Sequence, residues 1–303
     1  MQSYLTIRWL ADRAYRADAF ALYAYFRWLD DTVDERLVDR EQRLTFVVRQ
    51  RHLLAQAVDG ATLADLSSLA VSPEETLLVR LARPVGASPA GANDADGLLL
   101  SLRSMLDVME FDARRRGRPV AQRELDDYTR DLAVAVTEAL HHCIGHGERS
   151  PHDETRYVAV TGAHVAHMLR DLAEDLASGY LNIPAELLAD GHVSLEDLQT
   201  PALSTWVRDR VELARSCFVT GRRYLADVEN ARCRLAGHAY MARFEWVLDA
   251  VERDGYRLRS GYPERGTFRG GLTIAADGAR SALAARRTRS QRASAAAVRE
   301  AAR

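Results

Sequence analysis

Two short acidic clusters are the residues of this chain most suited to chemistry. Residues 30–34 read Asp-Asp-Thr-Val-Asp, and residues 171–175 read Asp-Leu-Ala-Glu-Asp. On an α-helix, residues four apart project from one face about 5–6 Å apart, so each cluster would present a pair of carboxylates. Keeping such pairs ionised beside apolar neighbours requires a cation or strong hydrogen-bond donors. Mg²⁺ held beside a diphosphate meets this need with oxygen ligands alone.

Each cluster ends a longer polar stripe with helical spacing. The first stripe consists of Tyr23, Arg27, Asp30, Asp31 and Asp34, and the second of His164, His167, Arg170, Asp171, Glu174 and Asp175. Facing one another in a helical bundle, two such stripes would form a metal and anion site in the core. The pair of stripes therefore predicts a Mg²⁺-diphosphate site.

The residues alone leave other interpretations open. The first cluster could be an exposed helix end at which Arg27 pairs with an aspartate. His164 and His167 with a nearby carboxylate could bind zinc or iron, since imidazole and carboxylate at helical spacing suit transition metals. A di-iron bundle needs paired Glu-x-x-His elements, and only one was found, from Glu138 to His141.

Helical periodicity dominates the chain, and no convincing run of alternating β-branched residues is present, so the predicted fold class is all-α. Helices are expected over residues 4–12, 16–34, 40–58, 73–82, 97–116, 121–145, 153–178, 201–228 and 231–255. A surface loop is expected from Pro84 to Gly97, and Ser194 to Asp197 has the capping-box pattern of a helix start. One domain is expected over residues 1–275, followed by an Ala/Arg-rich tail over 276–303 that is a frayed helix or disordered.

Composition limits the class of protein. The 303 residues are 47% hydrophobic and 28% charged with a net charge of -2, which is typical of a soluble globular protein and gives no signal for nucleic-acid binding. The chain contains no lysine, which excludes Schiff-base chemistry by a lysine. Three widely spaced cysteines, no signal-peptide pattern and no run of about 18 apolar residues favour a cytoplasmic protein. Peripheral contact with a membrane and the oligomeric state stay open.

These motifs resemble the squalene/phytoene synthase family of isoprenyl diphosphate transferases over roughly residues 3–260. The run over residues 21–35 resembles the family's Tyr-Ala-Phe-x-Arg-x-x-Asp-Asp-x-x-Asp motif at matching spacing, and residues 169–175 are similar to its second acidic motif. Further similar positions are Ser3-Tyr4, Arg16, Met109 to Asp112, Glu124-Leu125, Tyr128, Gly179, Ile183-Pro184, Tyr240 and Gly255-Tyr256.

The resemblance implies one all-α isoprenoid-synthase domain with a central active-site cavity, two or three Mg²⁺ ions and no nucleotide cofactor. The implied metal ligands are Asp30, Asp31, Asp34, Asp171, Glu174 and Asp175. Ser3, Tyr23, Arg27, Arg170 and Tyr240 would contact the diphosphate. Metal ions and arginine would neutralise the leaving group while water is excluded, so that the C–O bond of an allylic diphosphate ionises.

Three departures from the family pattern concern the acceptor. His164 and His167 stand where the family usually has Gln and Asn. Residues 179–184 read Gly-Tyr-Leu-Asn-Ile-Pro in place of Gly-Arg-x-Tyr-Leu-Pro, which weakens the case for handling two long diphosphates in succession. Val134 and Thr137 occupy glycine-like positions, and their larger side chains would narrow a substrate tunnel that they face. A shorter prenyl chain is the resulting hypothesis.

The expected function is transfer of a short prenyl group, such as dimethylallyl, to an aromatic, carbazole-like acceptor. The family has a divergent branch that prenylates carbazole-type aromatics, and this chain resembles it in keeping the metal motifs while altering surrounding positions. His164 or His167 would hydrogen-bond the acceptor or take its proton. The alternatives are head-to-head condensation of two diphosphates, cyclisation of one, and a non-catalytic binding or assembly factor, against which the intact aspartates argue.

Overall fold

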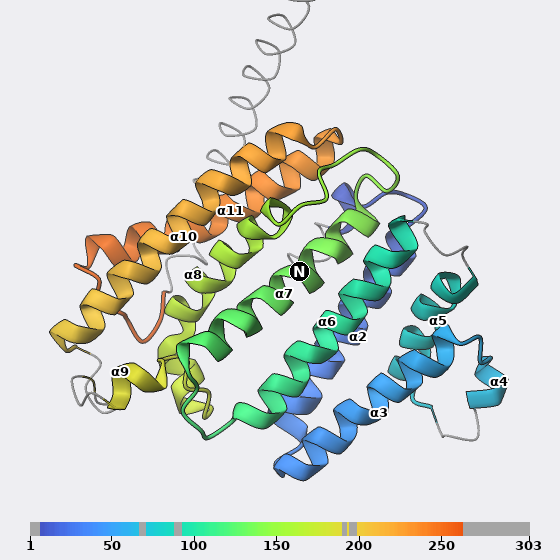
Figure 1. Ribbon diagram of the computed structural model, residues 1–303, viewed down its shortest axis with the longest axis horizontal. Coiled ribbons are helices and arrows are strands. Elements are labelled where there is room, and N and C mark those ends of the chain that lie inside the picture. Colours follow the sequence, from blue (N-terminus) through green and yellow to red (C-terminus); the bar gives the residue numbers. More distant parts are fainter. Residues whose placement is uncertain (1–6, 67–70, 88–92, 190–192, 194–198, 263–303) are drawn as a thin grey trace, which may run out of the picture. The chain divides into compact units, whose positions relative to one another are not determined.

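The computed structural model describes residues 7–66, 71–87, 93–189, 193 and 199–262 (Figure 1). Within these ranges the chain forms helices and turns and no strand, which confirms the all-α prediction; a single parallel bridge joins Val120 and Pro184. None of the described helices combines the length and apolar character needed to cross a membrane. Ser3, the predicted helix start at residues 194–197 and the C-terminal tail lie outside the described residues.

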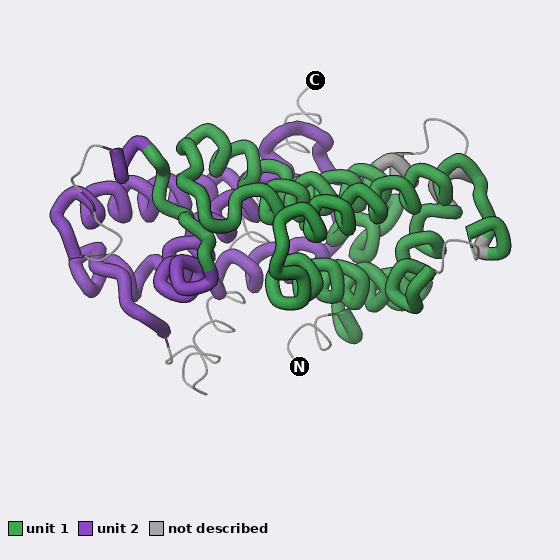
Figure 2. Tube along the Cα trace, turned by 90° about the horizontal axis from the view of Figure 1, so that it is seen from below, with its two compact units in different colours: residues 1–147, 179–185 green, residues 148–178, 186–303 purple. Residues whose placement is uncertain are grey.

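The chain divides into two compact units (Figure 2). Unit 1 comprises residues 1–147 and 179–185, and unit 2 comprises residues 148–178 and 186–303. The first acidic cluster lies in unit 1 and the second in unit 2. The expectation of one domain over residues 1–275 remains a prediction.

Unit 1 is a set of packed helices. Its elements are α2 (Arg16–Asp31), the π-helical turn η1 (Thr32–Arg36), α3 (Arg40–Val58), α4 (Leu63–Leu66), α5 (Pro73–Ala87), α6 (Asn93–Arg115) and α7 (Gln122–Cys143). Helix α2 buries Leu22, Tyr25 and Leu29, which follow steps of three and four residues and so lie on one face. Helix α3 begins where the Asp39 side chain accepts a hydrogen bond from the Gln42 N–H at 3.4 Å.

Helices α6 and α7 lie side by side in unit 1 (Figure 1), and the short segment 179–185 packs against the turn between them. The Gly117 N–H donates to the Gly179 carbonyl at 2.8 Å, and the Ala185 N–H donates to the Val120 carbonyl at 2.7 Å. Gly117 and Gly179 both have positive φ, which glycine adopts without steric cost. These contacts fix the segment that carries Tyr180 and Asn182.

Unit 2 is built on three long helices, α8 (Thr155–Ala177), α10 (Pro201–Asp227) and α11 (Ala231–Arg253). Helices α8 and α10 approach closely because both carry glycine at the contact. A Cβ on Gly162 would lie 2.7 Å from the Cys217 Cβ, and one on Gly221 would lie 2.7 Å from the Ala159 Cβ. The short helix α9 (Ala185–Ala189) follows segment 179–185 along the chain.

The predicted helix boundaries are largely reproduced, with three differences. The helix expected over residues 16–34 is α-helical to Asp31 and then widens into η1. Both ends of the loop expected from Pro84 to Gly97 are helical, because α5 continues to Ala87 and α6 begins at Asn93; residues 88–92 lie outside the described residues. Helices α4 and α9 were not predicted, since four or five residues are too few to display periodicity.

Candidate active site

The first acidic motif lies where α2 ends. Arg27 pairs with Asp31 at 2.7 Å and with Asp30 at 3.4 Å, and its side chain remains 58% exposed. Partial burial and the neighbouring Asp34 carboxylate raise the pKa of Asp30 to about 6, although the Arg27 charge opposes this shift. The motif thus holds more negative charge than Arg27 compensates.

The π-helical turn places Asp34 among donors from elsewhere in unit 1. The Leu37 N–H donates to the Thr32 carbonyl at 3.1 Å, a bond that spans five residues and widens the helix. The Tyr180 hydroxyl donates to Asp34 Oδ1 at 2.5 Å, and Arg116 Nη1 donates to the Asp34 carbonyl oxygen at 2.9 Å. Burial and the hydrogen bond to Asp34 raise the pKa of Tyr180, so its hydroxyl remains protonated and acts as the donor.

A buried ion pair lies behind Tyr180. Arg115 Nε donates to Asp112 Oδ1 at 2.6 Å, and Arg115 Nη1 donates to Asn182 Oδ1 at 2.6 Å. The guanidinium carbon lies 4.7 Å from the ring centroid of Tyr128 and 4.9 Å from that of Tyr180, within the range of cation–π attraction. The Tyr128 hydroxyl in turn donates to Asp112 Oδ2 at 3.2 Å. We call Asp112, Arg115, Tyr128 and Asn182 the buried network.

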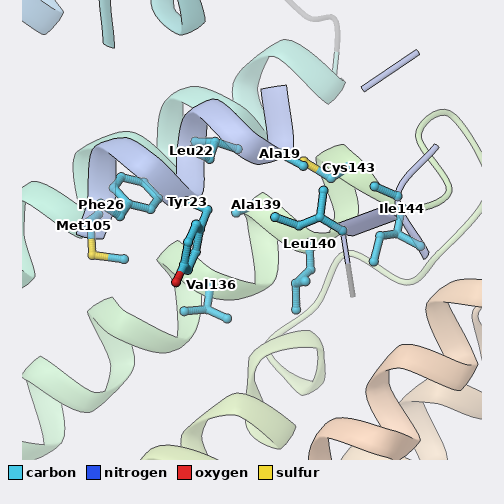
Figure 3. A pocket seen from close by; sticks show the side chains of 12 residues that line it. Ala19, Leu22, Tyr23, Phe26, Met105, Val136, Ala139, Leu140, Cys143 and Ile144 are labelled. Atoms are coloured by element: carbon cyan, nitrogen blue, oxygen red, sulfur yellow. The ribbon is translucent and has the colours of Figure 1, made fainter. Parts of the chain in front are cut away.

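An apolar cavity of about 200 Å³ opens in unit 1 on the same side of α2 as Asp30. Tyr23 and Phe26, which line it, precede Asp30 by seven and four residues, so they share its helix face. Figure 3 shows side chains of α2 and α7, among them Tyr23 and Leu140, projecting into this space. The full lining is Ile7, Ala11, Ala19, Leu22, Tyr23, Phe26, Met105, Val136, Ala139, Leu140, Cys143 and Ile144. The cavity suits a small hydrocarbon.

The second acidic motif lies on α8 in unit 2. His167 Nε2 lies 2.7 Å from Asp171 Oδ2, and Arg170 donates two hydrogen bonds to the Asp171 carboxylate. Burial raises the pKa of Asp171, but the bonds from Arg170 and His167 outweigh it and hold that pKa well below its usual range. Asp171 is therefore ionised at neutral pH.

Helix α11 brings aromatic and basic side chains to this part of α8. The Phe244 ring centroid lies 6.2 Å from that of His167 and 5.2 Å from that of Tyr240. Burial raises the pKa of Tyr240 to about 12. Arg243 lies over the Phe244 ring at 5.6 Å, and its buried Nε has no hydrogen-bond partner among the described residues. The Arg243 guanidinium thus has a donor to spare for an anionic ligand.

The donor chemistry of both motifs fits Mg²⁺. In the described residues, no three His, Cys, Asp or Glu side chains already converge on one point. Mg²⁺ is usually held by one or two carboxylates together with water and phosphate oxygens, and each motif offers carboxylates of this kind. Burial first, and then the Asp34 carboxylate, raise the pKa of Asp30, so its ionised form is unfavourable in the metal-free fold, and a divalent cation would compensate for this.

The predicted site residues fall into groups. In unit 1 the structure brings together Arg27, Asp30, Asp31 and Asp34, whereas Tyr23 lies about two turns earlier on α2 and lines the cavity. In unit 2 it brings together His164, His167, Arg170 and Asp171, with Tyr240 next to Phe244. Asp175 is partly buried and Glu174 is exposed, both on α8. His164 is buried whereas His167 is exposed. Val134 and Thr137 are buried but do not line the cavity; their neighbours Val136, Ala139 and Leu140 do.

Several residues of the site carried no role in the sequence interpretation. Asp112 and Tyr128 resemble family positions without a predicted role, and no motif of the sequence points to Arg115, Arg116 or Arg243. Asp112 and Arg115 stand three residues apart within one helix, a spacing typical of a helix ion pair. This spacing could have predicted their pairing from the sequence. The hydrogen bond from Tyr180 to Asp34 spans 146 residues and had no local signal.

Comparisons with known proteins agree with this description. A family model described as squalene/phytoene synthase matches residues 2–269. The crystal structure of the squalene synthase HpnC from Alicyclobacillus acidocaldarius has a TM-score of 0.63 and 21% identity, covering 86% of this chain and 91% of that chain. A dehydrosqualene synthase in complex with ligand has a TM-score of 0.62 and 17% identity, covering 90% and 89%. A search among curated proteins found no significant match.

Proposed function

Because this chain belongs to the squalene/phytoene synthase family, we propose that it is a Mg²⁺-dependent prenyltransferase that joins a short allylic prenyl group to an aromatic, carbazole-like acceptor and releases diphosphate. Members of this family use isoprenyl diphosphates in prenyl transfer. The observation that carries the finer proposal is the limited apolar cavity, whose lining residues on α2 share a helix face with Asp30.

The size of that cavity supports a short donor. An engineered cavity of about 150 Å³ lined by apolar side chains holds one benzene molecule. At about 200 Å³, the cavity of unit 1 suits a chain of one or two isoprene units and is small for two farnesyl chains. The rings of Tyr23 and Phe26 at its lining would stabilise an allylic cation through their π faces.

Both acidic motifs supply the groups for ionisation. Asp30, Asp34, Asp171 and Asp175 would hold the metal ions, with Asp31 and Glu174 as further carboxylates of the same motifs. Bound Mg²⁺ would supply charge neutralisation for the departing diphosphate. Arg27 and Arg170 would contact phosphate oxygens bidentately, exchanging part of their present pairing with aspartate for the ligand. Tyr240 would donate its hydroxyl to the same group.

The histidines of α8 would serve the acceptor. His167 is exposed and lies 2.7 Å from Asp171, which orients its ring and would stabilise the imidazolium formed when it takes a proton. His164 is buried one helical turn earlier and would hydrogen-bond the acceptor. After the allylic cation bonds to a ring carbon of the acceptor, the proton lost from that carbon would pass to His167.

A second candidate is head-to-head condensation of two isoprenyl diphosphates. The two similar solved structures favour it, since one is described as a squalene synthase and the other as a dehydrosqualene synthase. This candidate needs room for two long chains. The replacement of the family's Arg and Tyr by Tyr180 and Asn182 argues against a second diphosphate, because Tyr180 is engaged with Asp34 and Asn182 with Arg115.

Incubation with dimethylallyl, geranyl, farnesyl and geranylgeranyl diphosphates, Mg²⁺ and an aromatic acceptor panel separates these functions. A prenylated aromatic product is the expected result. Head-to-head hydrocarbons would replace this proposal by the second candidate, and cyclic hydrocarbons would indicate a cyclase. No diphosphate release with any partner would favour a non-catalytic binding protein.

Variants test the metal ligands in each unit. Asp30→Ala and Asp171→Ala are each expected to reduce diphosphate release by about 100-fold or more, because metal stabilisation of the leaving group is worth several kcal/mol. Far-UV circular dichroism should stay unchanged. Asp209→Ala, an exposed carboxylate on α10, is the matched control and should retain activity. Activity retained by Asp30→Ala would count against the metal site.

A further inference from the structure

Asp34 is held in unit 1 by contacts that a metal ligand at a free helix end would lack. Its carboxylate Oδ1 accepts the Tyr180 hydroxyl at 2.5 Å, and its carbonyl oxygen accepts Arg116 Nη1 at 2.9 Å. A carboxylate has about four lone-pair sites, so a single hydroxyl leaves Oδ2 and one lone pair of Oδ1 unused. Tyr180 therefore fixes the carboxylate without exhausting its ligand capacity.

Tyr180 is itself fixed. It is 6% exposed, and its ring stacks near the guanidinium of Arg115 at 4.9 Å. Arg115 also donates to Asn182, two residues further along the same segment, and the backbone of that segment bonds to Gly117 and Val120. The hydroxyl consequently has little freedom to leave Asp34.

We propose that Tyr180 is a positioning residue for Asp34, and that its hydroxyl presets the carboxylate for metal binding. This inference rests on the proposed function. The inference goes beyond the proposed function by assigning a role to a residue outside the predicted metal ligands and diphosphate contacts. Hydrogen-bond partners of metal ligands typically contribute 10–100-fold to metal affinity, because they fix ligand orientation.

The test measures metal binding rather than turnover. Mn²⁺ is titrated into the full chain, and free Mn²⁺ is followed by electron paramagnetic resonance. Tyr180→Phe is expected to raise the Mn²⁺ dissociation constant by about 10-fold or more. In assays of diphosphate release, the Mg²⁺ concentration giving half-maximal rate should rise by a similar factor while kcat at saturating Mg²⁺ changes less.

Tyr25→Phe is the matched control. Tyr25 is also a buried tyrosine of unit 1, but its hydroxyl donates to Gln50 at 3.2 Å and contacts no carboxylate of the motif. It should bind Mn²⁺ as the unaltered chain does. In an Asp34→Asn background, Tyr180→Phe should cause no further loss of affinity, because the two residues act as one unit.

The outcomes separate this inference from the proposed function. Unchanged Mn²⁺ affinity in Tyr180→Phe, with the unaltered chain binding Mn²⁺, would overturn the positioning role and leave the proposed function intact. An equal loss in Tyr25→Phe would also overturn it. No Mn²⁺ binding by the unaltered chain, either alone or with inorganic diphosphate, would overturn both. Thermal melts of each variant verify folding. If Tyr180→Phe unfolds, Arg116→Gln tests the second contact to Asp34. A smaller loss of Mn²⁺ affinity is then expected, and unchanged affinity would refute the positioning of Asp34 by these contacts.

Discussion

Removing the carboxylate of the buried network should destabilise unit 1 strongly. Asp112 and Arg115 form a hydrogen-bonded ion pair, with side chains 10% and 5% exposed. Asp112→Ala leaves the guanidinium with Asn182 and aromatic rings but no counter-charge, and it leaves the Tyr128 hydroxyl without its acceptor. Breaking a buried pair by removing one partner typically costs 3–5 kcal/mol. A loss of about 3–5 kcal/mol is therefore expected.

The expected loss in the free energy of unfolding corresponds to a fall in melting temperature. For a unit of about 150–250 residues, 1 kcal/mol shifts Tm by about 2–4 °C, so Asp112→Ala should lower the Tm of unit 1 by about 6–20 °C. Far-UV circular dichroism melts and urea titrations measure this change. If the two units unfold in separate transitions, only the transition of unit 1 should move.

The same helix provides a matched control. Asp107 on α6 pairs with Arg51 at 2.5 Å, but its side chain is 46% exposed, and exposed pairs contribute only about 0–1 kcal/mol. Asp107→Ala should therefore shift Tm little. An Asp112→Leu/Arg115→Met double variant should recover most of the loss, because it removes both buried charges together. An effect of Asp112→Ala no larger than that of Asp107→Ala would refute the reasoning.

Three further predictions concern helix packing, charge and the cavity. Gly221→Ala should cost about 1–3 kcal/mol in urea unfolding, because its Cβ would lie 2.7 Å from the Ala159 Cβ; Gly261→Ala, with no atom within 4 Å of its Cβ, should cost little, and equal losses would contradict the packing argument. Asp30→Asn should stabilise metal-free protein in EDTA above pH 6, because the raised pKa of Asp30 makes its ionisation unfavourable in the fold. This gain in the free energy of unfolding should vanish as pH falls below 4, and a gain independent of pH would contradict the reasoning. Ala139→Phe should lower kcat/KM for geranyl diphosphate at least about 10-fold more than for dimethylallyl diphosphate, because it fills the cavity, and an equal loss would argue against that location for the prenyl chain.

The features that could be predicted from the sequence depend on residues that lie close together in the chain. The stripe of Tyr23, Arg27 and Asp30 follows from helical spacing within α2, and the structure places these side chains on one face. The all-α class and most helix boundaries depend on the same periodicity. The π-helical turn was missed, because periodicity averaged over a helix does not register one widened turn held by Tyr180 and Arg116.

The sequence could not predict contacts between distant residues. Tyr180 meets Asp34 across 146 residues, and Arg115 meets Asn182 across 67. Both depend on the course of segment 179–185 after α8, which no local pattern specifies. The departures of this segment from the family pattern weaken the case for two long diphosphates in succession, but the sequence does not say what the new side chains contact. In the structure, Tyr180 and Asn182 bond within unit 1, to a metal-motif carboxylate and to Arg115 of the buried network.

The register of helix α2 places the proposed metal ligand Asp30 and part of the apolar cavity lining on one helix face. Leu22 and Phe26 line the cavity, and Asp30 follows at the next step of four on the same face. A helix rises 1.5 Å per residue, so Asp30 lies about 6 Å along the axis from Phe26. This spacing suits a diphosphate held at Asp30 with its first isoprene unit beside the Phe26 ring. A one-residue insertion or deletion between Phe26 and Asp30 would rotate Asp30 by about 100° away from the face that lines the cavity. The carboxylate and the apolar lining can therefore serve one substrate only while α2 is a continuous helix between them.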